Sequence, residues 1–372
     1  MTAGVYLHIP FCKSRCSYCD FATDVYRDSG AVQTYVDALC TEISHFSTDG
    51  IEADTIYFGG GTPSLLTPEQ VERILKAVRN QFKIPDRAEI TMEMNPATVT
   101  PETLAGYREL GVNRASFGVQ TFEDTHLKLL ARGHDAHDVR ETFSMLRKAG
   151  FDNVSFDLIA GLPGQTLDQW RRNLDEAIPL SPEHLSLYLL EIHEGTPLAE
   201  QVRTGRRPVP DEHIAAEMYE IMIDILAAAG YEQYEISNFS RPELASRHNT
   251  KYWRLEPVYG FGVSAHSFDG RERYANERDT AKYVALIGEA GSAEVMREEI
   301  ESASEFVFLG LRLEQGVDLG EYEQRFQKQL FATHEERIGE LINNGLLVLE
   351  GENLRLTRRG KLFSNEVFSV FV

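Results

Sequence analysis

The chain has 372 residues, 42% of them hydrophobic, so it can bury a sizeable core and has room for two or three domains, or for one barrel with an appendage. Lys and Arg number 37 against 58 Asp and Glu, and the resulting net charge of −21 argues against nucleic-acid binding. No apolar run is long enough to span a bilayer, and a strand pattern begins shortly after Met1. We therefore expect no signal or transit peptide and a cytoplasmic location.

The first half of the chain alternates short apolar strands with helical patterns. The predicted strands begin at Val5, Thr55, Glu89, Arg114, Asn153 and His184. Helix-start signals lie between them: Thr67-Pro68 and Thr100-Pro101 each open a helix, and Thr166 caps another. Strand–helix alternation with crossovers of this length predicts an α/β fold in which parallel strands form a partial (β/α)6 barrel.

The second half of the chain has a different pattern. The alternation stops near residue 204, and from about residue 301 the pattern is three helices followed by two short strands around the turn 350–353. This arrangement predicts a winged-helix-like unit at the end of the chain. We expect three domains: a barrel over 1–205, a linking and ligand-binding region over 206–300, and the winged-helix-like unit over 301–372. The last unit has 8 basic and 12 acidic residues, which favours packing or partner contact over DNA binding.

Three cysteines, Cys12, Cys16 and Cys19, follow the first strand with the spacing C-x3-C-x2-C. A cube of four irons and four sulfides has four irons to ligate, so three thiolates leave one iron open to chelate the amino and carboxylate groups of a small ligand. A disulfide would leave one cysteine over, and a zinc site requires four ligands, usually in two paired clusters. Cys40 lies in an amphipathic stretch and is predicted to pack as a small hydrophobe. The spacing therefore favours a [4Fe–4S] cluster.

Further polar and glycine-rich motifs fall where later strands end, which is where barrels carry their chemistry. Gly60 and Gly61 allow close approach of backbone to a ligand, Glu93 is a strand-end carboxylate, and Arg132 can pair with a carboxylate. Gln120, Asp157, Thr62 and Tyr18 complete the set of candidates. Each alone is more often structural, but together on one face of a barrel they predict a cofactor pocket.

These motifs resemble those of the oxygen-independent coproporphyrinogen III oxidase superfamily of radical S-adenosylmethionine (SAM) proteins. The resemblance runs through nearly the whole chain, from YLHIPFC and the cysteine loop to FGGGTPS, E-M-N-P, R-A-S-F-G-V-Q-T-F, ARGH and DLIAGLPGQT. It implies a [4Fe–4S] cluster on Cys12, Cys16 and Cys19. The SAM contacts that it implies are Tyr6, Tyr18, Gly60, Gly61, Thr62, Glu93, Gln120, Arg132 and Asp157.

Two departures separate the chain from the oxidases proper. The oxidases have a further cysteine two residues after the third ligand, where this chain has Phe21, and they have an extension before the first ligand. Both departures are shared with the HemW-type heme chaperones, and His248-Asn249-Thr250-Lys251-Tyr252-Trp253 matches the HNxxYW heme-binding motif of that branch.

The HNxxYW motif also has a physical reading of its own. Neutral imidazole is a common axial ligand of heme iron, and in a helix His248 and Tyr252 lie on one face. An aromatic side chain near the ligating imidazole, such as Tyr252 or Trp253, can stack on a porphyrin. The alternative is that His248 forms hydrogen bonds at a domain junction and Trp253 fills core.

The resemblance implies a heme chaperone with cluster, SAM and heme as its cofactors, and heme-acceptor proteins such as membrane-bound respiratory enzymes as its partners. It leaves a homodimer open. The chain would then not need to turn over SAM on a porphyrin. Two enzymatic alternatives are an oxygen-independent coproporphyrinogen III oxidase and a radical methyltransferase that opens heme.

Overall fold

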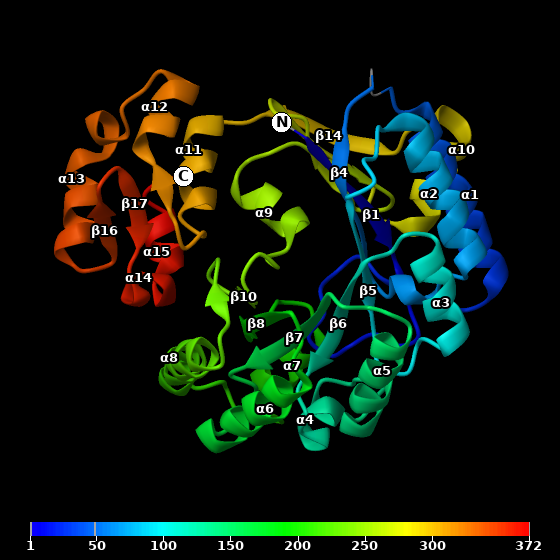
Figure 1. The fold of residues 1–372 in the computed structure, drawn as a ribbon, viewed down its shortest axis with the longest axis horizontal. Helices are drawn as coiled ribbons and strands as arrows, with labels where there is room; N and C mark the ends of the chain where they lie inside the picture. Colours follow the sequence, from blue (N-terminus) through cyan, green and yellow to red (C-terminus); the bar gives the residue numbers. More distant parts are fainter. Residues whose placement is uncertain (1, 48–49, 372) are drawn as a thin grey trace.

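A computed structural model describes residues 2–47 and 50–371, and within them a large open sheet organises the first three quarters of the chain (Figure 1). Its centre is formed by neighbouring parallel strands in chain order: β1 (Ala3–Ile9), β4 (Ala53–Gly60), β5 (Glu89–Met94), β6 (Arg114–Gln120), β7 (Val154–Ala160) and β8 (His184–Leu189). These are the strands predicted from the sequence, and the partial (β/α)6 barrel is confirmed.

Helices between these strands cover the outer face of the sheet (Figure 1). They are α1 (Ser29–His45), α2 (Pro68–Gln81), α3 (Pro101–Glu109), α4 (Asp124–Leu129), α5 (Ala136–Lys148) and α6 (Leu167–Leu180), with a 3₁₀ turn η1 (Pro63–Leu65) and two short strands β2 (Phe11–Cys12) and β3 (Asp24–Val25) around the cysteine loop. The predicted helix starts are confirmed. Thr67, Thr100 and Thr166 each cap a helix and accept a hydrogen bond from the backbone N–H three residues on.

The barrel strands have two chemically different faces, because successive side chains of a strand point to opposite sides. One face is apolar, and its residues join the main core: Val5, Leu7, Ile56, Phe58, Ile90, Met92, Ala115, Phe117, Phe156, Leu158 and Leu185. The residues between them on the same strands are polar or glycine over most of the sheet: Tyr6, His8, Thr55, Tyr57, Glu89, Thr91, Glu93, Arg114, Ser116, Ser155, Asp157, His184 and Ser186. The apolar face packs on the helices, and the polar face lines the inside of the partial barrel.

The segment 206–300 extends the same sheet at both edges. After α7 (Pro197–Arg203) and α8 (Glu212–Ala228), β9 (Glu232–Gln233) and β10 (Asn238–Ser240) add to β8 in antiparallel pairing. Beyond α9 (Arg247–Trp253), β11 (Val258–Phe261) pairs parallel to β1, and β12 (His266–Phe268), β13 (Glu272–Asn276) and β14 (Glu294–Glu299) continue from it, with α10 (Thr280–Ala290) between β13 and β14. The sequence did not predict these strands because most are too short to show a period-two pattern.

The last part of the chain forms a second apolar cluster, beside the barrel in Figure 1. It consists of α11 (Ser302–Gly310), β15 (Val317–Asp318), α12 (Leu319–Phe326), α13 (Leu330–Asn343), β16 (Leu347–Glu350), β17 (Asn353–Leu356), α14 (Arg358–Leu362) and α15 (Ser364–Phe368). The predicted hairpin is present: β16 and β17 pair antiparallel, and β15 adds a third strand. The three helices before this hairpin confirm the winged-helix-like unit.

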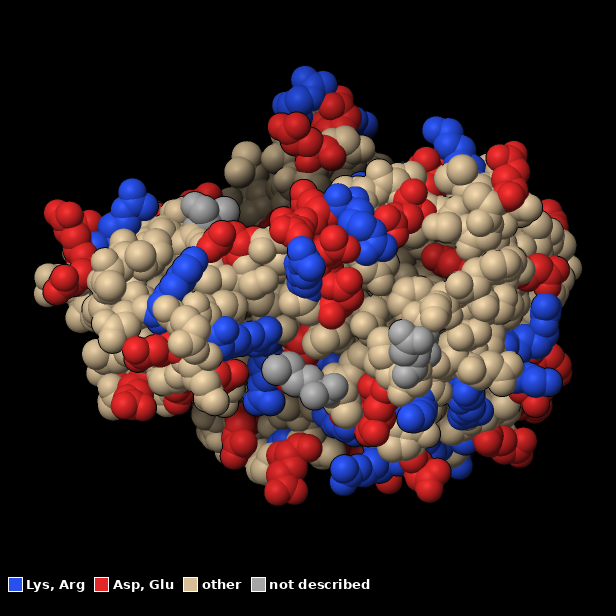
Figure 2. All heavy atoms as spheres, turned by 90° about the horizontal axis from the view of Figure 1, so that it is seen from above, with Lys and Arg blue, Asp and Glu red and all other residues tan. Residues whose placement is uncertain are grey.

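Charges of both signs are mixed over the face seen in Figure 2, where Lys and Arg side chains lie among Asp and Glu. That face therefore offers no broad basic surface of the kind that binds a polyanion. In the parts of the chain that the structure describes, every helix is too short or too polar to cross a lipid bilayer.

Candidate functional site

The three cysteines line one cavity at the carboxyl ends of the barrel strands, with a volume of about 580 Å³. Their loop runs from β2 to β3, and two other strand-end residues contact the sulfurs. The Thr62 hydroxyl donates to Cys12 Sγ at 3.6 Å, and Arg132 Nη1 donates to Cys16 Sγ at 3.4 Å. The loop after β1, the turn after β4 and the segment after β6 are therefore held together by the sulfur atoms.

The donor set suits an iron–sulfur cube better than a single ion. Among the described residues, no three His, Cys, Asp or Glu side chains converge closely enough to hold one metal ion. A cubane does not require such convergence, because each thiolate binds a different iron. Burial raises the pKa of the Cys12 thiol to about 11, so a bound cation is needed to keep this sulfur deprotonated at neutral pH.

The turn after β4 requires glycine. Gly60 has a φ of +111°, and a Cβ on this residue would lie 2.8 Å from the His8 ring. A Cβ on Gly61 would lie 2.7 Å from the backbone carbonyl of Pro10, just before the cysteine loop. The turn thus lies directly against the end of β1, and its backbone can approach a ligand in the cavity closely.

Glu93 projects from β5 into the cavity and binds two neighbours. Its carboxylate accepts a hydrogen bond from the Tyr57 hydroxyl at 2.8 Å and from Gly60 N at 3.1 Å. Burial, together with the nearby charge of Asp157, raises the pKa of Glu93 to about 7 against the opposing effect of these hydrogen bonds. Burial also raises the pKa of Asp157 to about 6. Two carboxylates that are costly to ionise therefore face the same cavity, and a cationic ligand would stabilise the ionised form of both.

Arg132 lies behind the cysteine loop and is held by β6. Its Nη2 donates to the Gly118 carbonyl at 2.8 Å and to Asn95, whose amide in turn donates to Thr62 at 2.8 Å. Burial lowers the pKa of Arg132, the neighbouring Tyr18 and Cys16 raise it, and the net shift is upward, so the guanidinium stays charged. Gln120, at the end of the same strand, lines the cavity with a φ of +66°, an uncommon backbone state for a residue with a side chain.

Most of the residues predicted to contact SAM therefore share one space. Those that line the cavity with the cysteines are Tyr18, Gly60, Gly61, Glu93, Gln120, Arg132 and Asp157. Thr62 is buried just behind it and contacts Cys12. Tyr6 lies deeper in the barrel, where its hydroxyl is 3.1 Å from His8 Nδ1 and its ring stacks on Tyr57. The sequence analysis did not select Asn95 and Tyr57, although Asn95 belongs to the E-M-N-P run that marked Glu93.

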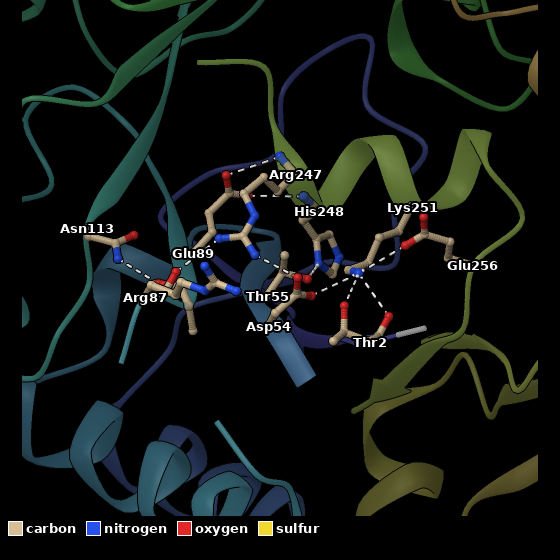
Figure 3. Close-up of polar contacts among 11 residues, drawn as sticks. Thr2, Asp54, Thr55, Arg87, Glu89, Asn113, Arg247, His248, Lys251 and Glu256 are labelled. Carbon is tan, nitrogen blue, oxygen red and sulfur yellow. Dashed lines mark hydrogen bonds and ion pairs between the residues drawn. The ribbon is translucent and has the colours of Figure 1, made fainter. Parts of the chain in front are cut away.

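The helix with the H-N-x-x-Y-W sequence, α9, lies at the opposite end of the strands. Figure 3 shows how polar contacts tie its first turn to the starts of β4 and β5. Glu89 accepts from the backbone N–H groups of Arg247 and His248, both at 3.1 Å, and Lys251 pairs with Asp54 at 2.9 Å. Among the described residues that line the cysteine cavity, none comes from α9.

His248 is 1% exposed, and both of its ring nitrogens have partners. Nδ1 lies 2.8 Å from the Thr55 hydroxyl, Nε2 lies 3.2 Å from the Tyr252 hydroxyl, and the ring stacks on Tyr57 at 5.0 Å. Burial, helped by the charges of Lys251 and Arg114, lowers the pKa of His248 to about 3, so the imidazole is neutral. Axial ligation of an iron by His248 therefore requires one of these hydrogen bonds to open.

The two aromatic residues of the motif are more accessible. Tyr252 is 37% exposed. Trp253 is half-buried, and its ring lies 4.3 Å from the guanidinium carbon of Arg312. The indole Nε1 is buried and has no hydrogen-bond partner among the described residues.

The partial barrel and its three-cysteine loop together define a radical SAM protein. Residues 6–177 match the family model of the radical SAM superfamily, and residues 298–363 match the HemN C-terminal domain. The structure of coproporphyrinogen III oxidase (HemN) from Escherichia coli is similar with a TM-score of 0.86 and 26% identity, over 100% of this chain and 90% of that one.

Two relatives narrow the assignment. The heme chaperone HemW of Bacillus subtilis is 38% identical over 99% of both chains, and that of Lactococcus lactis is 36% identical over 99% of this chain and 97% of its own. The chain therefore belongs to the HemW family of heme chaperones.

Proposed function

We propose that this protein binds a [4Fe–4S] cluster, SAM and heme, and delivers the heme to acceptor proteins. The observation that carries the proposal is the full-length relationship to proteins named heme chaperone, together with a cysteine loop that opens onto a cavity of cofactor size. When bound, a cluster with one open iron supplies a coordination site and a single electron.

The chain's own residues would hold SAM in the following way. Arg132, charged and fixed beside Cys16, binds the carboxylate of the methionine end. Glu93 and Asp157 take hydrogen bonds from amino and ribose hydroxyl groups, and Gln120 offers both a donor and an acceptor. Gly60 and Gly61 let backbone approach the same ligand, with Thr62 and Tyr6 supporting the turn, and Tyr18 covers the cluster from solvent.

Heme would bind to α9, with His248 as the axial ligand. The neutral state of this imidazole supports the assignment, because only the neutral form offers a lone pair to iron. Tyr252 and Trp253 lie on the accessible part of the helix and can stack on the macrocycle. Ligation by His248 would open its hydrogen bond with the Tyr252 hydroxyl, because Thr55, its other partner, lies deeper, on β4.

We propose further that the chain divides into a barrel (1–205), a heme-binding region (206–300) and a C-terminal unit (301–372). The C-terminal unit then contacts partners rather than nucleic acid. The protein works in the cytoplasm, alone or as a homodimer, and its acceptors include membrane-bound respiratory enzymes.

Oxidase activity is the alternative that the likeness to HemN keeps in view. The two functions are distinguished by incubating anaerobically reconstituted protein with a reductant, SAM and coproporphyrinogen III, and then titrating the same preparation with heme. We expect no protoporphyrinogen and one heme per chain. Product formation at a catalytic rate would refute the chaperone assignment, as would the absence of heme binding.

A further inference from the structure

The cysteine cavity does not end at the SAM candidates. It continues to the C-terminal unit, where its wall is formed by Tyr219, Ile236, Ser237, Arg312, Lys361 and Asn365. Leu187, Leu189 and Leu190 line it between the two ends. An apolar stretch therefore connects the cysteine loop to a polar end formed by the junction of the barrel and the C-terminal unit.

The charged side chains that line this far end are both cationic. Lys361 is 8% exposed and Arg312 is 27% exposed. Their acidic partners, Glu314 and Glu235, do not line the cavity. Positive charge is thus presented to the cavity, while the compensating carboxylates lie behind it.

Neither cation uses all of its donors on these partners. Arg312 Nη2 lies 3.7 Å from Glu235 Oε2, which is too long for a hydrogen bond, and Arg312 Nε is buried without a partner among the described residues. The Lys361 ammonium has three donors and contacts Gln233, at 2.7 Å, and Glu314. A buried cation with free donors is costly unless an acceptor arrives, and a carboxylate is the acceptor that matches Arg in charge and geometry.

Arg312 also connects this end of the cavity to α9, because its guanidinium lies over the ring of Trp253. An α-helix rises 1.5 Å per residue, so His248 and Trp253 are about 7.5 Å apart along α9. A planar ligand held by the helix therefore has the Arg312 guanidinium near its edge, and Lys361 lines the same end of the cavity as Arg312.

We propose that Arg312 and Lys361 form a carboxylate subsite that binds the propionate arms of the porphyrin cargo. This inference rests on the proposed heme-binding function and adds to it the residues that recognise the acid groups. The macrocycle itself stays at α9, and the two cations fix its orientation by binding its acid groups at the junction of the barrel and the C-terminal unit.

The test compares heme with heme dimethyl ester, in which both propionates are uncharged and the rest of the molecule is the same. We expect the unaltered protein to bind heme at least about tenfold more tightly than the diester, as expected for charge-assisted hydrogen bonds. The preference should disappear in the double variant Arg312→Met with Lys361→Met. Arg359→Gln, on α14 but outside the cavity, is the matched control and should keep it.

Equal binding of heme and diester by the unaltered protein would overturn the subsite and leave the proposed function standing. Binding of neither would overturn the proposed function itself. Removing Arg312 leaves the buried carboxylate of Glu235 without its cationic partner, and the protein could lose stability for that reason alone. Arg312→Lys therefore serves as a second variant, which keeps the positive charge and loses the planar set of donors. It should retain part of the preference, and a preference unchanged in every variant would also refute the assignment.

Discussion

The two ends of the barrel interior differ in what faces their acidic groups. At the carboxyl ends of the strands, Glu93 and Asp157 face a cavity with raised pKa values, and the hydrogen bonds that Glu93 accepts come from neutral groups, the Tyr57 hydroxyl and the backbone of Gly60. At the amino ends, Glu89 and Asp54 are hydrogen-bonded or ion-paired to α9, and His248 has a partner on each ring nitrogen. The first end is built to receive a ligand, and the second is closed by a helix of the protein itself.

Tyr57 contacts both ends. Its hydroxyl donates to Glu93 and its ring stacks on His248. Thr55, beside His248, and Gly60, which lines the cavity, are five positions apart along β4, a distance of about 17 Å. The comparison therefore predicts that a substitution at one end changes ligand binding at that end and has only a weak effect on binding at the other end.

Cys16→Ala should give the largest effect. Loss of one of three thiolates should lower the iron content of reconstituted protein from about four per chain to near zero. Cys40→Ala is the control, because Cys40 lies on α1, packs against the core and should leave the iron content unchanged. Full iron content in the Cys16 variant would contradict the ligand assignment.

His248→Ala should remove the axial ligand and destabilise the closed end. The change leaves Thr55 and Tyr252 without their partner and empties a buried volume, which should lower the free energy of unfolding by about 2–4 kcal/mol. Heme absorption and chemical denaturation measure the two effects. His137→Ala, at a position where the side chain is 74% exposed, should change neither.

Gly61→Ala and Gly288→Ala compare two glycines in different surroundings. The new Cβ would meet the backbone of Pro10, so we expect a loss of about 1–3 kcal/mol and weaker retention of the cluster. Gly288→Ala points into open space in α10 and should instead stabilise the protein by about 0.5–1 kcal/mol. Equal effects of the two changes would show that the turn after β4 does not lie against the cysteine loop.

Glu93→Gln should change the pH dependence of stability rather than the fold or the cluster ligands. The folded-state pKa of Glu93, about 7, lies above its ordinary value of 4.5, so the folded protein retains a proton that the unfolded chain releases. The stabilising contribution is complete below pH about 4.5 and is lost as the pH rises to about 7.

Unfolding of the cofactor-free protein, measured across this range, should show a smaller decline in the glutamine variant, with the part due to Asp157 remaining. An unchanged profile would mean that Glu93 is ionised in the folded state. SAM, a cation, should bind the unaltered protein more tightly above pH 7 than below it.

The barrel and its cysteine end were predictable because their signals are local. Thr67 with Gln70 marks a helix start within four residues, and C-x3-C-x2-C lies in a single loop. The sequence also indicates the polar face of the barrel, because polar and apolar residues alternate along the strands, for example Tyr6 with Leu7 and Tyr57 with Phe58.

The closed end depends on contacts between distant segments, which spacing alone does not reveal. Glu89 meets His248 across 159 positions, and Arg312 meets Trp253 through packing of the C-terminal unit. In the same way, β11 pairs with β1 and brings residues 258–261 beside residues 4–7. The sequence predicted that His248 and Tyr252 share a helix face, but not that the barrel buries the imidazole.

One titration tests the central claim that the cluster and the heme iron are bound at opposite ends of the barrel strands. Protein in which Cys12, Cys16 and Cys19 are all replaced by alanine is titrated with heme and its absorption followed. The account predicts one heme per chain with the spectrum of an axial imidazole, lost when His248→Ala is added. If cluster-free protein binds no heme, the two sites are not separate and the account is wrong.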